Sequence, residues 1–133
     1  MKEQMVLIVE DNLANQLLVS AVLEREGYVI ELAGSAVEAR AVIDRGLPNL
    51  ILMDVQLPGI DGLTFTRQLK ADPVTANIPI VALTALAMAG DRERTIAAGC
   101  AGYISKPINT RTFADEVRGY LRPKPEPHPT PAA

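Results

Sequence analysis

The chain has few of the residues on which several common kinds of protein depend. Its 133 residues include one cysteine, one histidine and no tryptophan. One cysteine cannot form an internal disulfide, and a zinc site of the usual cysteine and histidine ligands has too few donors. We expect Cys100, which lies between Gly99 and Ala101, to be a buried, reduced thiol that packs as a small hydrophobic side chain.

Long apolar segments are missing as well. No stretch of about 18 apolar residues occurs, so the sequence predicts no membrane-spanning helix. Residues 1–4 lead directly into a strand-like run, without the apolar region and cleavage site of a signal peptide. The net charge of −3 argues against direct binding to nucleic acid. We therefore expect a cytoplasmic protein that neither inserts into a membrane nor binds nucleic acid directly.

Length and composition indicate one globular domain followed by a short tail. Hydrophobic residues make up 48% of the chain and charged residues 22%, which is the balance of a domain with an ordinary core. Residues 1–122 are long enough for such a domain without disulfides or metals as supports. Residues 123–133 contain five prolines at alternate positions. We expect this tail to be disordered because it cannot bury a core of its own.

Short apolar runs alternate along the chain with segments of helical periodicity. Uninterrupted apolar runs are typical of strands buried on both faces of a sheet. The predicted strands are Met5–Val9, Tyr28–Leu32, Leu50–Met53, Ile78–Leu83 and Ala101–Ser105. The second of these admits polar residues, so we expect it at a sheet edge. Five helical segments follow the strands in turn, which predicts an α/β fold: a five-stranded parallel sheet with five helices on both faces.

Three helices carry more specific signals. In the first, apolar residues recur at the spacing of one helix face, which predicts that this face lies on the core; they are Ala14, Leu17, Leu18, Ala21 and Val22. The second opens with Ser35 and Glu38 at the spacing of a capping box, in which each side chain bonds the other residue's backbone amide. Asn109 or Thr110 is expected to cap the last helix.

Oxygen-bearing or cationic side chains follow four of the predicted strands: Glu10 with Asp11, then Asp54, Thr84 and Lys106. Ligands of an open parallel sheet bind at the carboxyl ends of its strands, so we expect these groups to meet. An aspartate at a strand end is by itself more often a turn former than a reactive group. Three converging carboxylates, however, would repel each other without a cation, and oxygen ligands of this kind suit Mg²⁺. The pattern indicates phosphoryl transfer to Asp54, with Thr84 and Lys106 contacting the phosphoryl group.

With these features the chain resembles a response-regulator receiver domain. The likeness covers roughly residues 4–122, and it is specific because five separated motifs occur in the family's order. They are the acidic pair Glu10–Asp11, the acceptor segment Leu52–Val55, the turn Pro58–Gly62, the segment Leu83–Ala85 and the segment Ser105–Pro107. Within the family the chain is most similar to single-domain regulators of the DivK type, and it is also similar to the receivers of hybrid histidine kinases.

The resemblance implies a CheY-like, flavodoxin-like fold with strand order 2-1-3-4-5. It implies that Asp54 accepts a phosphoryl group from the phosphohistidine of a sensor histidine kinase or a histidine phosphotransfer protein. By position, the resemblance also implies that Asp11, Asp54 and the Gln56 backbone carbonyl bind Mg²⁺, with Glu10 acting through water. It implies that Thr84 and Lys106 contact the phosphoryl group and that Thr84 and Tyr103 form the switch. The Lys106–Pro107 peptide bond is expected to be cis.

The function implied is that of a single-domain response regulator in a two-component system or phosphorelay. Phosphorylation would change protein binding through the face formed by the fourth helix, fifth strand and fifth helix. Leu86 lies beside the expected path of the attacking water and cannot orient it, so we expect slow self-dephosphorylation. The chain would then be a phosphoacceptor with no other enzymatic activity.

The same residues allow four other interpretations. The chain could be a receiver fragment of a hybrid histidine kinase. A Mg²⁺-dependent phosphohydrolase would need an acid two residues after its nucleophile, where this chain has Gln56. A nucleotide or flavin module would need a glycine-rich loop, where the chain has Glu10–Asn15. A docking module that is never phosphorylated would have no use for the complete acidic set.

Overall fold

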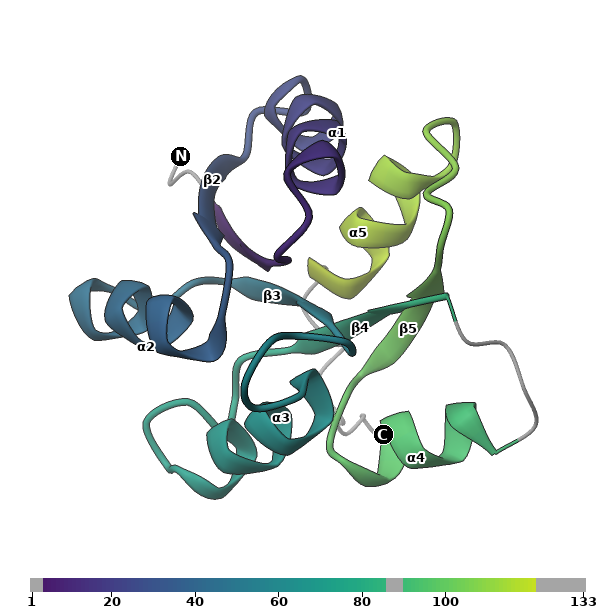
Figure 1. Ribbon diagram of the computed structural model, residues 1–133. Coiled ribbons are helices and arrows are strands. Elements are labelled where there is room, and N and C mark those ends of the chain that lie inside the picture. The colour runs from purple at the N-terminus through teal and green to yellow at the C-terminus, as the bar shows by residue number, and fades with distance from the viewer. Residues whose placement is uncertain (1–3, 86–89, 122–133) are drawn as a thin grey trace, which may run out of the picture.

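Five strands and five helices alternate in the computed structural model, which describes residues 4–85 and 90–121 (Figure 1). The strands are β1 (Met5–Val9), β2 (Val29–Ala33), β3 (Leu50–Asp54), β4 (Ile80–Thr84) and β5 (Gly102–Ser105). The helices are α1 (Leu13–Glu24), α2 (Ala36–Arg45), α3 (Gly62–Ala71), α4 (Asp91–Ala97) and α5 (Phe113–Leu121). The predicted α/β class is confirmed. None of the helices described is long and apolar enough to span a membrane.

The strands form one parallel sheet in the order β2-β1-β3-β4-β5, as the resemblance implied. β3 and β4 are buried at every residue, whereas β2 is a partly exposed edge strand. The pairing aligns the carboxyl ends of neighbouring strands: Val9 pairs with Met53, Asp54 with Leu83, and Thr84 with Ser105. This register brings the polar residues that follow the strands to a single edge of the sheet.

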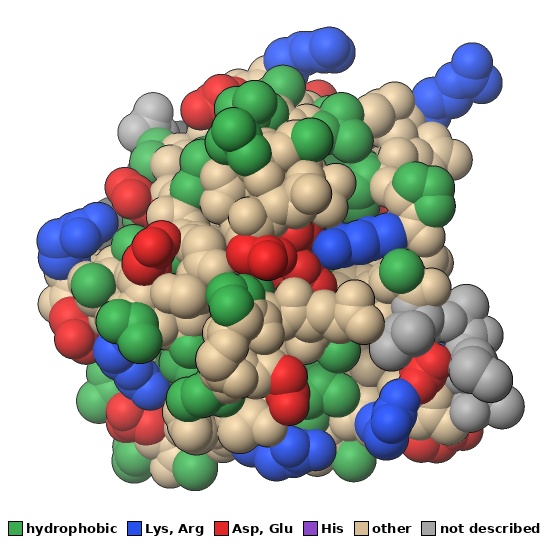
Figure 2. Space-filling view, viewed as in Figure 1, with side chains coloured by type: hydrophobic (Ala, Val, Ile, Leu, Met, Phe, Trp, Pro, Cys, Tyr) green, Lys and Arg blue, Asp and Glu red, His purple; other side chains and the backbone are tan. Residues whose placement is uncertain are grey.

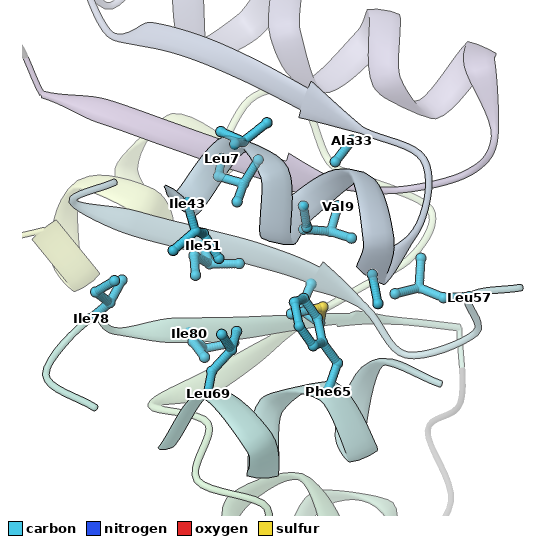
Figure 3. Close-up of a cluster of buried hydrophobic side chains, with 14 of the residues drawn as sticks. Leu7, Val9, Ala33, Ile43, Ile51, Leu57, Phe65, Leu69, Ile78 and Ile80 are labelled. Carbon is cyan, nitrogen blue, oxygen red and sulfur yellow. The ribbon is translucent and has the colours of Figure 1, made fainter. Parts of the chain in front are cut away.

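The sheet separates two hydrophobic clusters because successive side chains of a strand point to opposite faces. One cluster, shown in Figure 3, joins Leu7, Val9 and Ile51 of the sheet to side chains of α2 and α3 such as Ile43 and Phe65. The other lies beneath α1 and α5 and includes Val19 and Phe113. In Figure 1, α1 and α5 lie on one side of the sheet, and α2 and α3 lie on the other. The prediction of helices on both faces is confirmed.

The predicted core face of α1 is wrong. Leu17 and Leu18 are 58% and 38% exposed, and Ala14 and Ala21 are exposed as well; of the predicted face, only Val22 is partly buried. The buried residues are Val19, Ser20 and Leu23. Apolar residues occur on more than one side of α1, so periodicity alone could not choose between two stripes that differ by two residues.

The capping predictions were correct in part. Ser35 caps α2 by accepting a hydrogen bond from the Glu38 amide at 3.2 Å. The Glu38 carboxylate, however, accepts from the Gly34 amide at 2.7 Å, one residue before the amide that a capping box predicts. Asn109 makes the hydrogen bonds of a cap: its Oδ1 accepts from the Arg111 amide at 2.9 Å, and its carbonyl accepts from the Phe113 amide at 2.9 Å. Its carbonyl also accepts from the Thr112 amide, so residues 110–112 form a turn that leads into α5, which begins at Phe113.

Strand boundaries differ from prediction by one or two residues. β4 begins at Ile80 rather than Ile78, after Pro79, which has no amide to donate to a ladder. Ile78 is nevertheless buried. Cys100 is a buried free thiol, as predicted. Leu86 and the expected proline-rich tail lie outside the described residues.

Candidate functional site

Three carboxylates meet at the carboxyl edge of the sheet. Glu10 and Asp11 follow β1, and Asp54 ends β3; one carboxylate oxygen from each lies within 4.8 Å of the others. Glu10 and Asp54 are 1% and 4% exposed, whereas Asp11 faces solvent. In the view of Figure 2, acidic side chains gather in the middle of this face with a basic side chain beside them. The structure therefore brings together the three acidic residues that the sequence predicted to meet.

Lys106, which follows β5, supplies the cation beside these carboxylates. Its Nζ lies 2.9 Å from Glu10 Oε1 and 3.3 Å from Asp54 Oδ2. The contact with Glu10 is an ion pair without the angles of a hydrogen bond, since Glu10 Oε1 has no hydrogen-bond partner. The Lys106 amide donates to the Thr84 carbonyl at 2.8 Å, which holds the end of β5 beside the end of β4. One ammonium thus offsets part of the charge of two buried carboxylates.

The two buried carboxylates have different proton affinities. Burial raises the pKa of Asp54 to about 6; the Gln56 amide opposes this rise, and Glu10 adds to it. Burial alone would also raise the pKa of Glu10, but Lys106 and the Asn12 amide outweigh burial and lower this pKa. Burial alone would lower the pKa of Lys106, but the Glu10 and Asp54 carboxylates outweigh it and raise this pKa. Near neutral pH the site therefore holds an ionised Glu10, a charged Lys106 and an Asp54 whose charge is costly.

The turn after β3 fixes the position of Asp54. The Gln56 amide donates to Asp54 Oδ1 at 2.9 Å. The Gly62 amide donates to the Val55 carbonyl at 2.9 Å, which brings the start of α3 against the end of β3. A Cβ at position 62 would lie 2.0 Å from the Asp54 carbonyl oxygen, so only glycine fits there. Asp61 caps α3 by accepting from the Thr64 amide at 2.9 Å. The sequence showed the turn, but it did not show that Gly62 packs against the Asp54 backbone.

The loop between β1 and α1 is held by side chains at both ends. Glu10 Oε2 accepts from the Asn12 amide at 3.1 Å, and Asn12 Oδ1 caps α1 by accepting from the Asn15 amide at 2.9 Å. Gln16 Nε2 donates to the Glu10 carbonyl at 2.6 Å. Sequence reasoning missed Gln16, because it lies on the helix face that was predicted to point outward. The sequence did offer one signal for it: a polar residue in the first turns of a helix that follows an acidic pair.

The remaining predicted residues lie around the same edge or beside it. Thr84 is buried at the end of β4, one strand beyond Asp54. The Lys106–Pro107 peptide bond is cis. Tyr103 lies on β5 with its side chain 37% exposed, in a shallow groove of about 440 Å³. Arg92, Ile96, Glu116 and Tyr120 also line this groove, which lies between α4, β5 and α5. Tyr103 thus faces outward, into this groove.

The donor set at the edge fits a divalent cation that prefers oxygen ligands. Mg²⁺ is bound in proteins by one or two carboxylates and keeps several of its waters. The exposed Asp11 and the buried Asp54 offer two such carboxylates within 4.8 Å of each other, and Glu10 lies within the same distance. Lys106 occupies one side of this cluster, which leaves the solvent side at Asp11 for a cation.

Comparison with known proteins identifies similar chains. Residues 6–118 match the family described as "Response regulator receiver domain". The polar-differentiation response regulator DivK of Brucella ovis is 44% identical over 116 residues, which cover 87% of this chain and 94% of that protein.

Solved structures of similar proteins superpose on this chain. A response regulator from Chloroflexus aurantiacus superposes with a TM-score of 0.85 at 32% identity, covering 90% of this chain and 98% of the other. The receiver domain of a sensor histidine kinase from Pseudomonas aeruginosa superposes with a TM-score of 0.81 at 35% identity, with the same coverage of both chains. That structure is described as having a magnesium ion coordinated in its active site cleft.

Proposed function

The chain belongs to the response regulator receiver family, and on that premise we propose that Asp54 accepts a phosphoryl group from the phosphohistidine of a partner protein. One observation carries this proposal: Asp54 is a buried carboxylate at an open sheet edge, with Lys106 Nζ at 3.3 Å and two more carboxylates within 4.8 Å. The proposed role is a switch in a two-component system or phosphorelay. The cytoplasmic location expected from the sequence stays a prediction.

In the proposed transfer, a carboxylate oxygen of Asp54 attacks the phosphorus atom. The new P–O bond forms as the P–N bond to the donor's imidazole breaks, and the released histidine takes up a proton from solvent. Because the pKa of Asp54 is about 6, most of this carboxylate is ionised and nucleophilic at neutral pH. Mg²⁺, when bound by Asp11, Asp54 and the Gln56 carbonyl, supplies charge that offsets the phosphoryl oxygens.

Lys106 and Thr84 are proposed to contact the phosphoryl group on the aspartate. Lys106 already lies beside Asp54 Oδ2, so a phosphoryl oxygen would attract its ammonium as the carboxylate charge is lost. The Thr84 hydroxyl, at the next strand end, offers a neutral donor. Movement of Thr84 toward the phosphoryl group would free space into which the exposed Tyr103 could turn, which is the proposed switch.

Two surfaces are proposed to bind partner proteins, one the phosphodonor and the other a downstream target. The outer face of α1 exposes the apolar side chains Leu13, Leu17 and Leu18 directly after the acidic loop. Figure 2 shows hydrophobic side chains over α1 next to the acidic cluster. We assign this face to the phosphodonor, because a donor docked there can reach Asp54. The groove beside Tyr103, between α4, β5 and α5, is assigned to a downstream target.

Chemical phosphorylation tests the proposal. The full chain is incubated with acetyl phosphate and Mg²⁺, and intact mass is measured. We expect one added phosphoryl group that hydroxylamine removes, because acyl phosphates are cleaved by this nucleophile. The Asp54→Asn variant should take up none, and EDTA should prevent uptake by the wild-type protein. Uptake by Asp54→Asn at the wild-type level would overturn the assignment of the acceptor.

A Mg²⁺-dependent phosphohydrolase is the alternative with the same residues. Gln56 stands where such an enzyme would need an acid, and its side chain is exposed rather than packed against Asp54. Release of phosphate from many substrate molecules per protein would favour the hydrolase. A single, lasting phosphoryl group per chain would favour the switch.

A further inference from the structure

The three carboxylates of the site differ in how their positions are held. Glu10 has its oxygens beside Lys106 Nζ and the Asn12 amide, at 2.9 and 3.1 Å. Asp54 has the Gln56 amide and Lys106 Nζ, at 2.9 and 3.3 Å. The Asp11 side chain is exposed and, within residues 4–85 and 90–121, forms no hydrogen bond or ion pair. The direction of the Asp11 carboxylate therefore depends on the backbone that carries it.

Gln16 holds that backbone. Its Nε2 donates to the Glu10 carbonyl at 2.6 Å. This carbonyl oxygen and the Asp11 nitrogen belong to one planar peptide unit. A hydrogen bond to the oxygen restricts rotation of the whole plane, and with it the direction in which the Asp11 side chain leaves the chain. Gln16 itself is half-buried on α1, and its backbone amide donates to the Asn12 carbonyl at 3.0 Å, so the donor is attached to a rigid element.

We propose that Gln16 is a positioning residue for the cation site: it orients Asp11 by holding the Glu10–Asp11 peptide. The proposal rests on the function proposed above, since it assigns to Asp11 a role in binding Mg²⁺. Gln16 touches neither the cation nor the phosphoryl group. Its effect reaches the site through one peptide plane, and it should therefore appear in the binding of the cation rather than in the chemistry of transfer.

The composition of the core-facing side of α1 agrees with this role. The core-facing stripe carries two polar residues, Gln16 and Ser20, among the apolar Val19 and Leu23. Ser20 Oγ is buried and has no hydrogen-bond partner, so this hydroxyl makes no polar contact with the site. Gln16 has a short bond to the acidic loop. The two residues therefore form a matched pair for testing, since both are polar side chains of one helix face and only one reaches the site.

The test compares the wild-type chain with Gln16→Met and Ser20→Ala. Methionine has nearly the length of glutamine and suits a helix, but it cannot donate to the Glu10 carbonyl. Mg²⁺ affinity is measured by calorimetry, and exchange of the Asp11 and Asn12 amides is measured by NMR without the cation. We expect about tenfold weaker Mg²⁺ binding in Gln16→Met, as for other groups that orient a metal ligand, with faster exchange of both amides. Ser20→Ala should match the wild-type protein in both measurements.

A second measurement separates positioning from a merely structural role. The rate of phosphorylation by acetyl phosphate is followed against Mg²⁺ concentration. In Gln16→Met the half-saturating Mg²⁺ concentration should rise by the same factor as the dissociation constant, while the rate at saturating Mg²⁺ stays within about twofold of wild type. If Gln16→Met does not fold, Gln16→Ala takes its place, because alanine also lacks the donor and favours helix.

The outcomes are distinguishable. Wild-type Mg²⁺ affinity in Gln16→Met overturns the positioning role, even if the variant is less stable, and leaves the proposed phosphorylation of Asp54 standing. Loss of only the saturating rate also overturns it, because that result would place Gln16 in the transfer step. Failure of the wild-type chain to bind Mg²⁺ overturns both the proposed function and the role of Gln16.

Discussion

Burial has opposite consequences along the five residues of β3. Leu50–Met53 are fully buried and apolar, and each such side chain stabilises the fold by about 1.5–3 kcal/mol. Asp54 is nearly as buried, at 4% exposed, but burial raises its pKa to about 6. Four residues of one strand thus contribute stability, and the fifth costs stability in its charged form. The same rigid strand therefore supplies both the support for the site and the burial that makes the charge of its carboxylate costly.

The largest expected effect comes from the stabilising part of the strand. Leu52→Ala should lower the free energy of unfolding by about 2–5 kcal/mol, because it leaves a cavity in a closely packed core. Urea denaturation measures the change. Val37→Ala, at an 80% exposed position on α2, is the control and should change stability by less than about 0.5 kcal/mol. If Leu52→Ala cost no more than Val37→Ala, the contrast within β3 would disappear.

The second effect has the opposite sign and depends on pH. The pKa of Asp54 is raised from 3.8 to about 6 in the folded chain, so the folded state binds the proton more tightly than the unfolded state. This contribution to stability is fully present below pH 3.8 and is lost as the pH rises to about 6. Above that range the charged Asp54 costs up to about 3 kcal/mol, at about 1.4 kcal/mol per pKa unit.

Asp54→Asn should therefore be more stable than the wild-type chain by about 1–3 kcal/mol at pH 7.5 in EDTA, and the gain should vanish near pH 4. Urea denaturation at several pH values tests this. The control is Asp44→Asn, since Asp44 is exposed on α2; its effect should not grow over the same range. A gain for Asp54→Asn that is the same at every pH would contradict the assigned cause. Saturating Mg²⁺ should reduce the gain, because it stabilises the wild-type site.

A third substitution should affect both the stability of the fold and the position of Asp54. Gly62→Ala places a Cβ 2.0 Å from the Asp54 carbonyl, so α3 and the end of β3 must move apart. We expect a loss of about 1–3 kcal/mol of stability, together with slower phosphorylation by acetyl phosphate. Gly119→Ala is the control, because nothing lies within 4 Å of its Cβ position; it should be neutral or stabilising. Unchanged phosphorylation in folded Gly62→Ala would show that the turn does not position Asp54.

The smallest expected effect on stability belongs to the exposed face of α1. Leu17→Asp, at a position 58% exposed, should change the free energy of unfolding by less than about 0.5 kcal/mol. It should slow phosphoryl transfer from a histidine-containing donor protein at least about tenfold but leave phosphorylation by acetyl phosphate unchanged. Val74→Asp, at a position 66% exposed after α3, is the control and should change neither rate. Equal transfer to both variants would remove the docking assignment of α1.

Most of the fold could be predicted from the sequence because its signals are local. Uninterrupted apolar runs such as Leu50–Met53 indicate buried strands, and the alternation with helices indicates a parallel sheet. The rule that ligands bind at strand ends then predicted that Glu10, Asp11 and Asp54 would meet, and the structure brings them within 4.8 Å. These inferences needed only the order of residues and the geometry of the chain.

The errors arose where a choice depends on contacts distant in the sequence. The apolar residues of α1 allowed two core-facing stripes, and packing on the sheet chose the one with Val19 and Leu23. The exposed Leu17 and the inward Gln16 follow from that choice. The close approach of Gly62 to Asp54 likewise requires the start of α3 to fold back on β3. No periodicity reports such contacts, because each depends on the arrangement of elements that are separated along the chain.

By itself, then, the sequence determined the strands, their helices and which charged residues would share an edge of the sheet. Tertiary structure decided how that edge is charged. Lys106 lies between Glu10 and Asp54, at 2.9 and 3.3 Å, and burial acts on both carboxylates. The physical reason is that charge interactions depend on distance and surroundings in three dimensions. The identity of Asp54 is local, but its proton affinity, on which its proposed role as a phosphoryl acceptor depends, is set by the folded chain.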